Sequence, residues 1–452
     1  MAVRRWRSIV FAVAGGLALS VAPGTAPAVA ADGCPGIGRA VVPGAERQLA
    51  ACLADLTTAG TAPSGHTVPG DYAGLTAAGT VNPTGVPGIQ VDGYFPDTST
   101  GNTNHGWNHD SQFVLRLPER WNGGLVVTGA PGVRRQYAND LAISDYVLAR
   151  GYAFAATDKG NTGASFYRDG RRPGDAVVEW NLRVTQLTVA AKAAVALRYG
   201  RLPSQTYMTG LSNGGYLTRW QLENVPWLYD GGVDWEGTLF RADGPNLLTY
   251  LPTALRAYPR YVAGDPTARD EMIAAGFSPG SEPLWAFHYQ VYWDLTSRIY
   301  REEFDPTWDG ELEAGIPFCA SGTPDCDADY DYASRPAEVK QAVARVQLTG
   351  RLGKPMLTLH GDKDTLLPRE TDSDVYAGLI AAAGRGGLHR YYVVADGNHV
   401  DGLYNALPTV TRPILPCYRD AFAALEAWTK RGVAPPPSGT LPRPAGDVVN
   451  TC

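Results

Sequence analysis

Short apolar runs that end in glycine-rich turns alternate with longer stretches of helical periodicity in the first half of the chain. Residues 125–128 form an apolar run that enters the turn Gly-Ala-Pro-Gly, and residues 152–157 enter a second turn rich in glycine. Runs this short, bounded by glycine, are typical of buried strands. Residues 178–199 instead repeat apolar side chains along one helical face, from Trp180 to Val195. Buried strands that alternate with helices predict a parallel sheet in an α/β protein.

The same two patterns predict the other regular elements. Strands are expected at residues 88–95, 112–117, 205–209, 232–237, 355–359 and 391–394, and a short amphipathic helix at 216–224. Near the N-terminus, residues 32–79 mix Pro, Gly, Thr and Ala. One helix is expected there, at residues 45–57, from the spacing of Leu49, Cys52, Leu53 and Leu56.

Residues 1–31 have the composition of a secretory signal peptide. Three arginines precede an apolar stretch at residues 9–21, and Ala28-Val29-Ala30 provides a small-residue cleavage site. The apolar stretch is shorter than the roughly twenty residues that a membrane span needs, and no later stretch reaches that length. We therefore expect a protein secreted to the extracellular space, with an uncleaved anchor as the alternative.

All of the cysteines lie beyond the expected cleavage site: Cys34, Cys52, Cys319, Cys326, Cys417 and Cys452. In an oxidising compartment an even number fits three disulfides, although six cysteines allow fifteen pairings. Proximity along the chain favours pairing each cysteine with its nearest neighbour, Cys34 with Cys52, Cys319 with Cys326, and Cys417 with Cys452. Metal ligation is the alternative, but the paired C-x-x-C spacing of zinc sites is missing.

Composition and charge narrow the class of partner. An apolar fraction of 44% in 452 residues supports a large folded core rather than a disordered chain. The formal charge is −6, and the 39 basic residues fall to 36 without the three arginines of the signal peptide, against 45 acidic residues. Because nucleic-acid binding relies on clustered basic residues, this composition disfavours a nucleic-acid partner. The oligomeric state is left open.

The stretch Gly210-Leu211-Ser212-Asn213-Gly214-Gly215 lies between a predicted strand and a predicted helix and matches the G-x-S-x-G pattern of a nucleophile elbow. The glycines are needed because a serine nucleophile stands on a sharp turn where backbone segments come close together. The same letters also occur in plain turns of glycine-rich chains. The flanking strand and helix favour the elbow, so Ser212 is the candidate nucleophile.

A serine nucleophile requires a histidine that takes its proton and a carboxylate that orients the histidine. In the loop after the predicted strand at residues 355–359, Asp364 takes the acid position, with Asp362 as the runner-up. His399 follows the last predicted strand and is the candidate base, whereas His360 is expected to be structural. The chain order of serine, aspartate and histidine is that of the α/β hydrolases.

Backbone N–H groups beside the nucleophile are expected to stabilise the oxyanion of an acyl-transfer reaction. We expect them from Asn213 and from Ala130, with Gly129 as the alternative to Ala130. Glu236, at the end of a predicted strand, is an alternative to Asp364 as the acid. No organic cofactor is implied.

The spacing of these candidates predicts an insertion. His399 follows Asp364 by 35 residues, which suits one helix and one strand, but Asp364 follows Ser212 by 152 residues, far more than two strand–helix units need. We therefore divide the chain into a signal peptide at 1–31, a first part of the core at 32–242, an insertion at 243–336 and a second part of the core at 337–452.

The insertion is expected to form a lid over the nucleophile. Its aromatic residues suggest a cleft that receives an apolar or aromatic group, and they include Trp285, Phe287, Tyr289, Tyr292, Trp293, Tyr300, Phe304 and Trp308. Individually, those at helical spacing are better explained as the core of the lid. After Cys326, the residues Asp327, Asp329 and Asp331 alternate and would offer oxygen ligands to calcium, but the later glycine and glutamate of an EF-hand loop are missing.

Several stretches resemble the tannase and feruloyl esterase family of α/β hydrolases, across most of the chain after the signal peptide. They are Leu-Pro-Glu-Arg-Trp-Asn-Gly at 117–123, Gly-Tyr-Ala-Phe-Ala-Ala-Thr-Asp at 151–158, Ser-Asn-Gly-Gly at 212–215, and the acid and base loops. The resemblance implies a secreted serine esterase with a lid inserted before the acid, often carrying calcium, that cleaves esters of phenolic acids or similar carboxylic esters. The family often pairs two cysteines at positions where this chain has Leu211 and Val400.

Three other functions are compatible with these residues. A related hydrolase would act on aliphatic hydroxyacid oligomers or polyesters. An acyltransferase would use the same serine, histidine and aspartate but pass the acyl group to an alcohol. A non-catalytic surface-binding protein would not need all three of these positions filled. In the first two cases, as in the esterase, the partner is a small-molecule or oligomeric ester.

Overall fold

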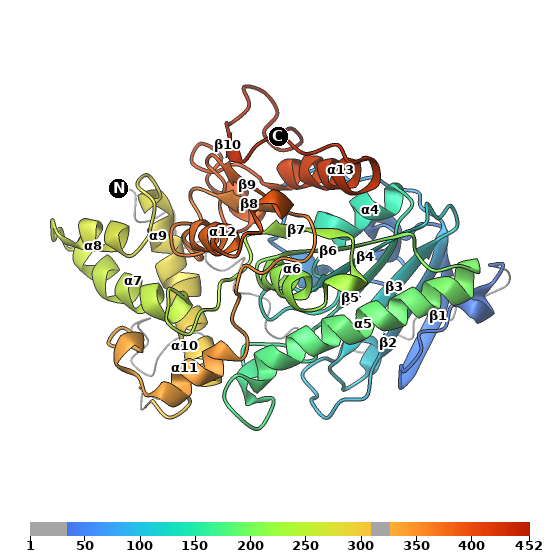
Figure 1. Cartoon of the computed structure of the whole chain (residues 1–452), viewed down its shortest axis with the longest axis horizontal. Helices are drawn as coiled ribbons and strands as arrows, with labels where there is room; N and C mark the ends of the chain where they lie inside the picture. Colours follow the sequence, from blue (N-terminus) through green and yellow to red (C-terminus); the bar gives the residue numbers. More distant parts are fainter. Residues whose placement is uncertain (1–33, 309–325) are drawn as a thin grey trace.

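The computed structural model of the chain describes residues 34–308 and 326–452. Within them, ten strands form one sheet in the order β1-β2-β3-β5-β4-β6-β7-β8-β9-β10 (Figure 1). The strands are β1 Arg47–Leu53, β2 Gly88–Tyr94, β3 Gln112–Pro118, β4 Gly124–Gly129, β5 Ala153–Thr157, β6 Gln205–Leu211, β7 Gly231–Trp235, β8 Met356–Gly361, β9 His389–Val394 and β10 Gly439–Leu441. The neighbouring pairs β1–β2, β2–β3 and β3–β5 are antiparallel. Every later pair in the strand order, from β5–β4 to β9–β10, is parallel. The mostly parallel sheet confirms the predicted α/β-hydrolase fold.

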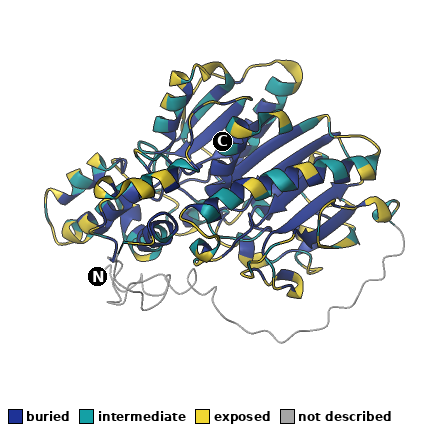
Figure 2. Ribbon diagram, turned by 60° about the horizontal axis from the view of Figure 1, so that its bottom comes forward, coloured by how far each residue is buried: buried dark blue, intermediate teal, exposed yellow. Residues whose placement is uncertain are grey.

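Helices cover both faces of the sheet. They are α4 Asp145–Ala149, α5 Asp175–Tyr199, α6 Asn213–Asn224, α12 Ser373–Ala382 and α13 Leu415–Arg431, with the short helices α2 Thr58–Thr61 and α3 Pro69–Tyr72 before the second strand. Because successive strand residues point to opposite faces, Leu125 and Val127 of β4 pack in one core with α5 and α6, whereas Val126 packs in another with α4 and α13. Figure 2 shows the buried strands between helices whose outer sides are exposed.

Helix α5 confirms the prediction made for residues 178–199 and starts three residues earlier. Its apolar face, which includes Trp180, Val184 and Leu187, is fully buried. Gly174 and Gly200 bound the helix with φ of 86° and 77°, a left-handed conformation that glycine adopts without steric cost. The 25-residue helix therefore has defined ends on both sides.

The described residues of the expected insertion, 243–308 and 326–336, are largely helical. They contain α7 Leu247–Val262, α8 Ala268–Ala274, α9 Glu282–His288, the π-helical turn η7 Tyr289–Trp293 and α10 Asp294–Phe304, and α11 Ala337–Ala344 follows. In Figure 1 these helices form a group to one side of the sheet. Trp285 and Trp293 are fully buried among them, in a core continuous with that of α5 and α6.

The helix expected at residues 45–57 is wrong, because this segment forms the edge strand β1. All seven of its residues pair with β2, so that Cys52 lies opposite Ile89. The leucines of this segment do not share one face: Leu49 in the strand is half exposed, and Leu56, beyond the strand, is fully buried. Pairing with a neighbouring strand outweighs the local helical spacing.

Two of the three expected disulfides are confirmed, Cys34–Cys52 and Cys417–Cys452. The third involves Cys319, which lies outside the described residues, as does the expected signal peptide at residues 1–31. Across the described part of the chain, no helix combines the length and the apolar character that crossing a membrane requires.

Candidate active site

Ser212 occupies a sharp turn between β6 and α6. It is a non-glycine residue with φ of 59°, an unusual conformation for a side chain of this kind, and its N–H donates to the Trp235 carbonyl at 2.9 Å. Glycines permit the turn: a Cβ at Gly210 would lie 2.3 Å from the Gly214 backbone, and one at Gly214 would lie 2.6 Å from the Gly129 carbonyl oxygen. Ser212 itself is only half-buried, although the backbone segments around it are closely packed.

The structure brings Ser212, His399 and Asp364 into one hydrogen-bonded chain. Ser212 Oγ lies 3.0 Å from His399 Nε2, and His399 Nδ1 lies 2.7 Å from Asp364 Oδ2. Burial lowers the pKa of His399, but the charge of Asp364 and its hydrogen bond outweigh burial and raise the pKa above its ordinary value. The histidine can therefore accept the serine proton while the aspartate stabilises the imidazolium that results.

Asp364 is held as a carboxylate by its loop. Its Oδ1 accepts the backbone N–H groups of Leu366 at 2.8 Å and Leu367 at 2.9 Å. Burial would raise the pKa of this carboxyl, but the charges of His399 and His360, with their hydrogen bonds, hold the pKa well below its usual range. His399 and His360 thus both stabilise the ionised form of the buried Asp364.

The other two residues considered in the acid loop have different contacts. Asp362 accepts the Asp396 backbone N–H at 2.7 Å. His360, at the end of β8, is fully buried; its Nδ1 lies 2.6 Å from Ser373 Oγ, and its Nε2 donates to the Leu367 carbonyl at 2.8 Å. Neither residue makes a hydrogen bond to His399 in the described part of the chain.

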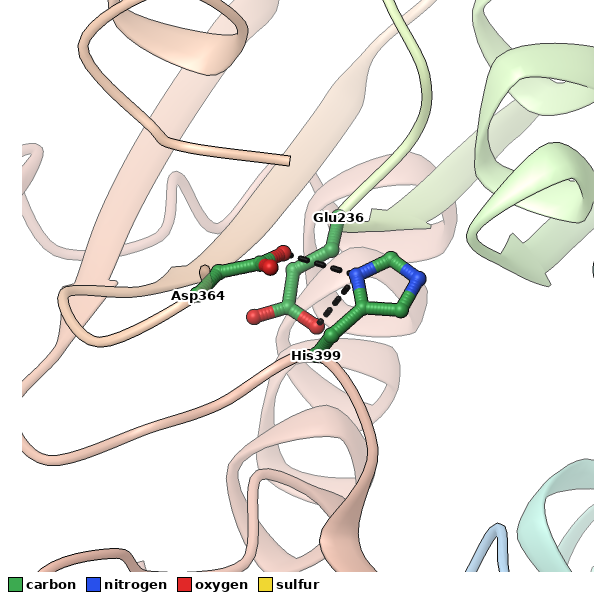
Figure 3. A group of neighbouring side chains, drawn as sticks. All are labelled: Glu236, Asp364 and His399. Carbon is green, nitrogen blue, oxygen red and sulfur yellow. Dashed lines mark hydrogen bonds and ion pairs between the residues drawn. The ribbon is translucent and has the colours of Figure 1, made fainter. Parts of the chain in front are cut away.

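Glu236 follows β7 and points toward the same histidine (Figure 3). Its Oε2 lies 3.9 Å from His399 Nδ1 and has no hydrogen-bond partner in the described residues, while its Oε1 accepts the Gly361 N–H at 2.8 Å. Burial, together with the charge of Asp364, raises the pKa of Glu236 to about 8. At neutral pH this carboxyl is therefore mainly protonated beside the ionised Asp364.

Glu236, Asp364 and His399 are also the group of three in the described residues whose potential ligand atoms all lie within 4.8 Å of one another. His399 Nδ1 already donates its proton to Asp364, so the contacts are those of an acid–base cluster.

The three aspartates considered as calcium ligands form no such group in the described residues. Asp327 is fully buried and pairs with Arg301 Nε at 3.2 Å, which uses the charge a cation would need. Asp329 and Asp331 are exposed, and Asp331 Oδ1 accepts the Ala333 N–H at 3.1 Å.

Ala130 is wrong as an oxyanion donor, because its N–H is already used: it donates to the Thr157 carbonyl at 3.0 Å. The pairing of β4 with β5 continues one residue beyond the strand, and Gly129, the alternative, is the last residue of β4, opposite Thr157. By contrast, the Asn213 N–H, in the first turn of α6, has no acceptor among the described residues, as expected for a helix N-terminus.

The two residues that follow Pro131 offer N–H groups instead. Gly132 and Val133 line the pocket beside Ser212, and neither N–H has an acceptor in the part of the chain that is described. Gly132, the last residue of the turn Gly-Ala-Pro-Gly, has φ of 50°, a conformation that favours glycine.

The Asn213 side chain ties three parts of the site together, a contact that the sequence did not indicate. Its Nδ2 donates to the Gly132 carbonyl at 2.9 Å and to Tyr300 Oη at 2.6 Å, and its Oδ1 accepts from Thr238 Oγ1 at 3.1 Å. The nucleophile turn, the Gly132 turn and helix α10 of the insertion are therefore connected through one buried amide.

An apolar pocket opens at Ser212 and His399. Besides these two, its wall includes Leu75, Val133, Arg134, Leu247, Phe287, Tyr292, Leu295, Ile299, Tyr300, Leu366, Leu367 and Val400. Of the aromatic residues singled out in the insertion, Phe287, Tyr292 and Tyr300 line this pocket, whereas Trp285 and Trp293 are fully buried. The pocket therefore joins the core and the insertion around the serine.

Comparison with known proteins agrees with this fold. Residues 99–233 match the sequence model of the family described as tannase and feruloyl esterase. The chain is 30% identical over 147 residues to a mono(2-hydroxyethyl) terephthalate hydrolase of Piscinibacter sakaiensis, a match that covers 28% of this chain and only 23% of that relative.

Among solved structures, feruloyl esterase B from Aspergillus oryzae superposes with a TM-score of 0.52 at 14% identity, covering 86% of this chain and 88% of that one. A second esterase from Aspergillus oryzae superposes with a TM-score of 0.54 at 14% identity, covering 89% of this chain and 91% of that one. At such low identity these structures establish the fold, and the family match rests on residues 99–233. The fold is therefore that of the α/β hydrolases, and residues 99–233 are similar to the tannase and feruloyl esterase family.

Proposed function

We propose that this protein is a secreted serine esterase that cleaves carboxylic esters, chiefly of aromatic acids, through an acyl-enzyme on Ser212. The observation that carries the proposal is the hydrogen-bonded chain from Ser212 Oγ through His399 to Asp364, on an elbow that opens into an apolar pocket. The family match and the esterase fold support the reaction class. Two disulfides and the signal-like N-terminal sequence support export.

The reaction follows from the contacts of these residues. Ser212 Oγ attacks the ester carbonyl carbon while His399 Nε2 takes the serine proton, and His399 returns that proton to the alcohol oxygen as the ester C–O bond breaks. Water then attacks the acyl-enzyme by the same route, releasing the acid and restoring the serine hydroxyl. Asp364 stays ionised throughout and orients His399.

The oxyanion is stabilised by backbone N–H groups. In our proposal Asn213 supplies one, and Gly132 or Val133 supplies the other, since these N–H groups lack a protein acceptor in the described residues and border the pocket. Removing one such donor typically costs about two to three orders of magnitude in rate.

An aromatic acyl group is favoured over an aliphatic one by the pocket and by the relatives. Phe287, Tyr292 and Tyr300 present rings to the pocket, and offset or edge contacts between aromatic rings add to the burial of apolar surface. The terephthalate hydrolase and the feruloyl esterase are both named for esters of aromatic acids.

The test is an ester panel on purified protein and matched variants. Wild type is expected to hydrolyse methyl ferulate or methyl gallate faster than hydroxybutyrate oligomers, and to be labelled by a fluorophosphonate probe. Ser212→Ala and His399→Ala should each lose at least about three orders of magnitude in rate while remaining folded. Ser64→Ala, at an exposed serine, is the control and should keep full activity. Faster turnover of hydroxybutyrate oligomers would favour the polyester alternative. No ester turnover and no labelling would contradict the esterase.

A further inference from the structure

Arg134 is the one side chain with a permanent charge among the described residues that line the pocket at Ser212. No aspartate or glutamate lines that pocket in the described chain, and its other titratable members are histidines and tyrosines. Burial lowers the pKa of His288 in this wall to about 4, so that imidazole is neutral at physiological pH. The pocket therefore combines an apolar surface with a single positive charge.

The Arg134 guanidinium is held by one of its terminal nitrogens only. Nη1 donates to the Asp71 carbonyl at 2.8 Å and to the Ala73 carbonyl at 2.9 Å, which uses both of its N–H groups. Nε and Nη2 have no hydrogen-bond partner within the described residues, and no acidic side chain there lies within the 4.0 Å of an ion pair with Arg134. These two nitrogens form one edge of the planar group, the edge that can donate two parallel hydrogen bonds to a carboxylate.

The surroundings of Arg134 strengthen an interaction with an anion. The side chain is half-buried, and burial lowers the pKa of Arg134, although an arginine remains charged at any pH at which the protein is folded. The charge of the Asp71 carboxyl partly offsets this loss of hydration, but that carboxyl lies beyond ion-pair distance of Arg134. A partly dehydrated cation without a close ion-pair partner is a costly arrangement, and an anionic ligand offsets the cost. One positive charge matches one carboxylate.

We propose that Arg134 binds a carboxylate on the substrate, so that the preferred substrates are esters with an apolar body and a free carboxylate remote from the ester bond. This inference rests on the proposed esterase function, and it names the substrate class. The apolar body fills the space between Ser212 and Arg134 against Phe287 and Tyr292, and the carboxylate accepts from Nε and Nη2. If Arg134 only fixed the carbonyls of Asp71 and Ala73, its substitution would change the turnover of every ester alike.

The experiment compares esters that differ only in this charge. The pairs are monomethyl terephthalate with methyl 4-carbamoylbenzoate, and methyl 4-carboxycinnamate with its primary amide, so that each acid has a neutral partner of the same shape. In wild type, kcat/KM for the better of the two acids should exceed that for its amide by at least about tenfold, as expected for charge-assisted hydrogen bonds. Arg134→Gln should bring this ratio to one or below, mainly through a higher KM for the acid.

Two further variants make the result specific. Arg134→Lys keeps the charge but loses the planar edge, so its ratio should fall between those of wild type and Arg134→Gln. Arg135→Gln, at the neighbouring arginine outside the pocket wall, should keep the wild-type ratio.

Equal wild-type rates for acid and amide in both pairs would overturn the carboxylate site while leaving the esterase intact, and this arm needs no variant to fold. An equal fall for acid and amide in folded Arg134→Gln would also overturn it. Loss of turnover on all four esters, with no fluorophosphonate labelling of wild type, would instead contradict the proposed function.

Discussion

Glu236 Oε2 lies 3.9 Å from His399 Nδ1, the ring nitrogen that Asp364 Oδ2 contacts at 2.7 Å (Figure 3). Two carboxyls from the ends of different strands therefore face one atom of the candidate base. Only Asp364 is ionised at neutral pH, because burial and the charge of Asp364 raise the pKa of Glu236 to about 8. Removing the charge of Asp364 removes one of the two causes that keep Glu236 protonated.

The first prediction is that Glu236 partly replaces Asp364 when that residue is neutralised. Asp364→Asn should lower kcat by about two to four orders of magnitude, because the amide favours the wrong tautomer of His399. The double variant Asp364→Asn/Glu236→Gln should lose at least about a further tenfold, a coupling that a double-mutant cycle measures. Asp364→Asn/Asp362→Asn is the control, since Asp362 contacts the Asp396 N–H instead. Equal rates for the two double variants would show that Glu236 does not take over.

The second prediction concerns the acid limb of the pH–rate profile. His399 must be neutral to take the Ser212 proton, and the charge of Asp364 raises the pKa of His399 above its ordinary value despite burial. As the pH falls, kcat/KM should therefore decline with a midpoint above about 6.5, the ordinary histidine value. Asp364→Asn should move the midpoint to lower pH. A neutral ester without titratable groups is the substrate for this measurement, and a wild-type midpoint below the ordinary value would contradict the assignment of His399.

The parts of this molecule that follow local rules were predictable from sequence. Strands β4 and β5 are short apolar runs closed by glycine, and α5 repeats its apolar residues with helical spacing. The positions of Ser212, Asp364 and His399 follow from the elbow motif and from chain order. The helix predicted at residues 45–57 is wrong because the strand that pairs with this segment, β2, lies too far along the chain to influence a local sequence pattern.

The contacts that fix the details of the site join residues far apart in sequence. The prediction of Ala130 as an oxyanion donor is wrong because its N–H donates to the Thr157 carbonyl, 27 residues away in the chain. The contact of Asn213 with Tyr300 spans 87 residues. No spacing rule relates such pairs, since each depends on how the insertion and the strands pack together.

The third prediction is that the Asn213 side chain positions the Gly132 turn. Asn213→Ala removes the hydrogen bonds to the Gly132 carbonyl, Tyr300 Oη and Thr238 Oγ1 but keeps the Asn213 backbone N–H. Because a misplaced oxyanion donor loses most of its effect, kcat should fall by about ten- to a hundredfold with little change in KM. Tyr300→Phe removes only the second contact and should cost less. Asn224→Ala, at an exposed asparagine of the same helix, is the control, and an equal effect there would contradict a positioning role.

The fourth prediction is that Arg219, on the nucleophile helix α6, contributes strongly to stability because it forms a fully buried charge network with residues outside that helix. Its Nε donates to Asp234 Oδ2 at 2.7 Å, its Nη1 to Asp372 Oδ1 at 2.7 Å and its Nη2 to Ser373 Oγ at 2.6 Å. Arg219→Met leaves two buried carboxylates without their ion-pair partner, and breaking such a pair typically costs about 3–5 kcal/mol in the free energy of unfolding. Urea unfolding of wild type and variant measures this loss.

The pH dependence of that loss has a definite sign. Burial already raises the pKa of Asp372, and removing Arg219 raises this folded-state pKa further above the unfolded value. The folded variant then binds more protons than folded wild type. Its stability relative to wild type therefore falls as the pH rises from the folded-state pKa of Asp372 in wild type to the higher one in the variant. The deficit should be larger at pH 8 than at pH 5. Arg260→Met, which removes exposed ion pairs with Asp265 and Glu271, is the control and should leave the unfolding midpoint nearly unchanged at both values. A deficit for Arg219→Met that is the same at both pH values would mean that the carboxylates are not what destabilises the variant.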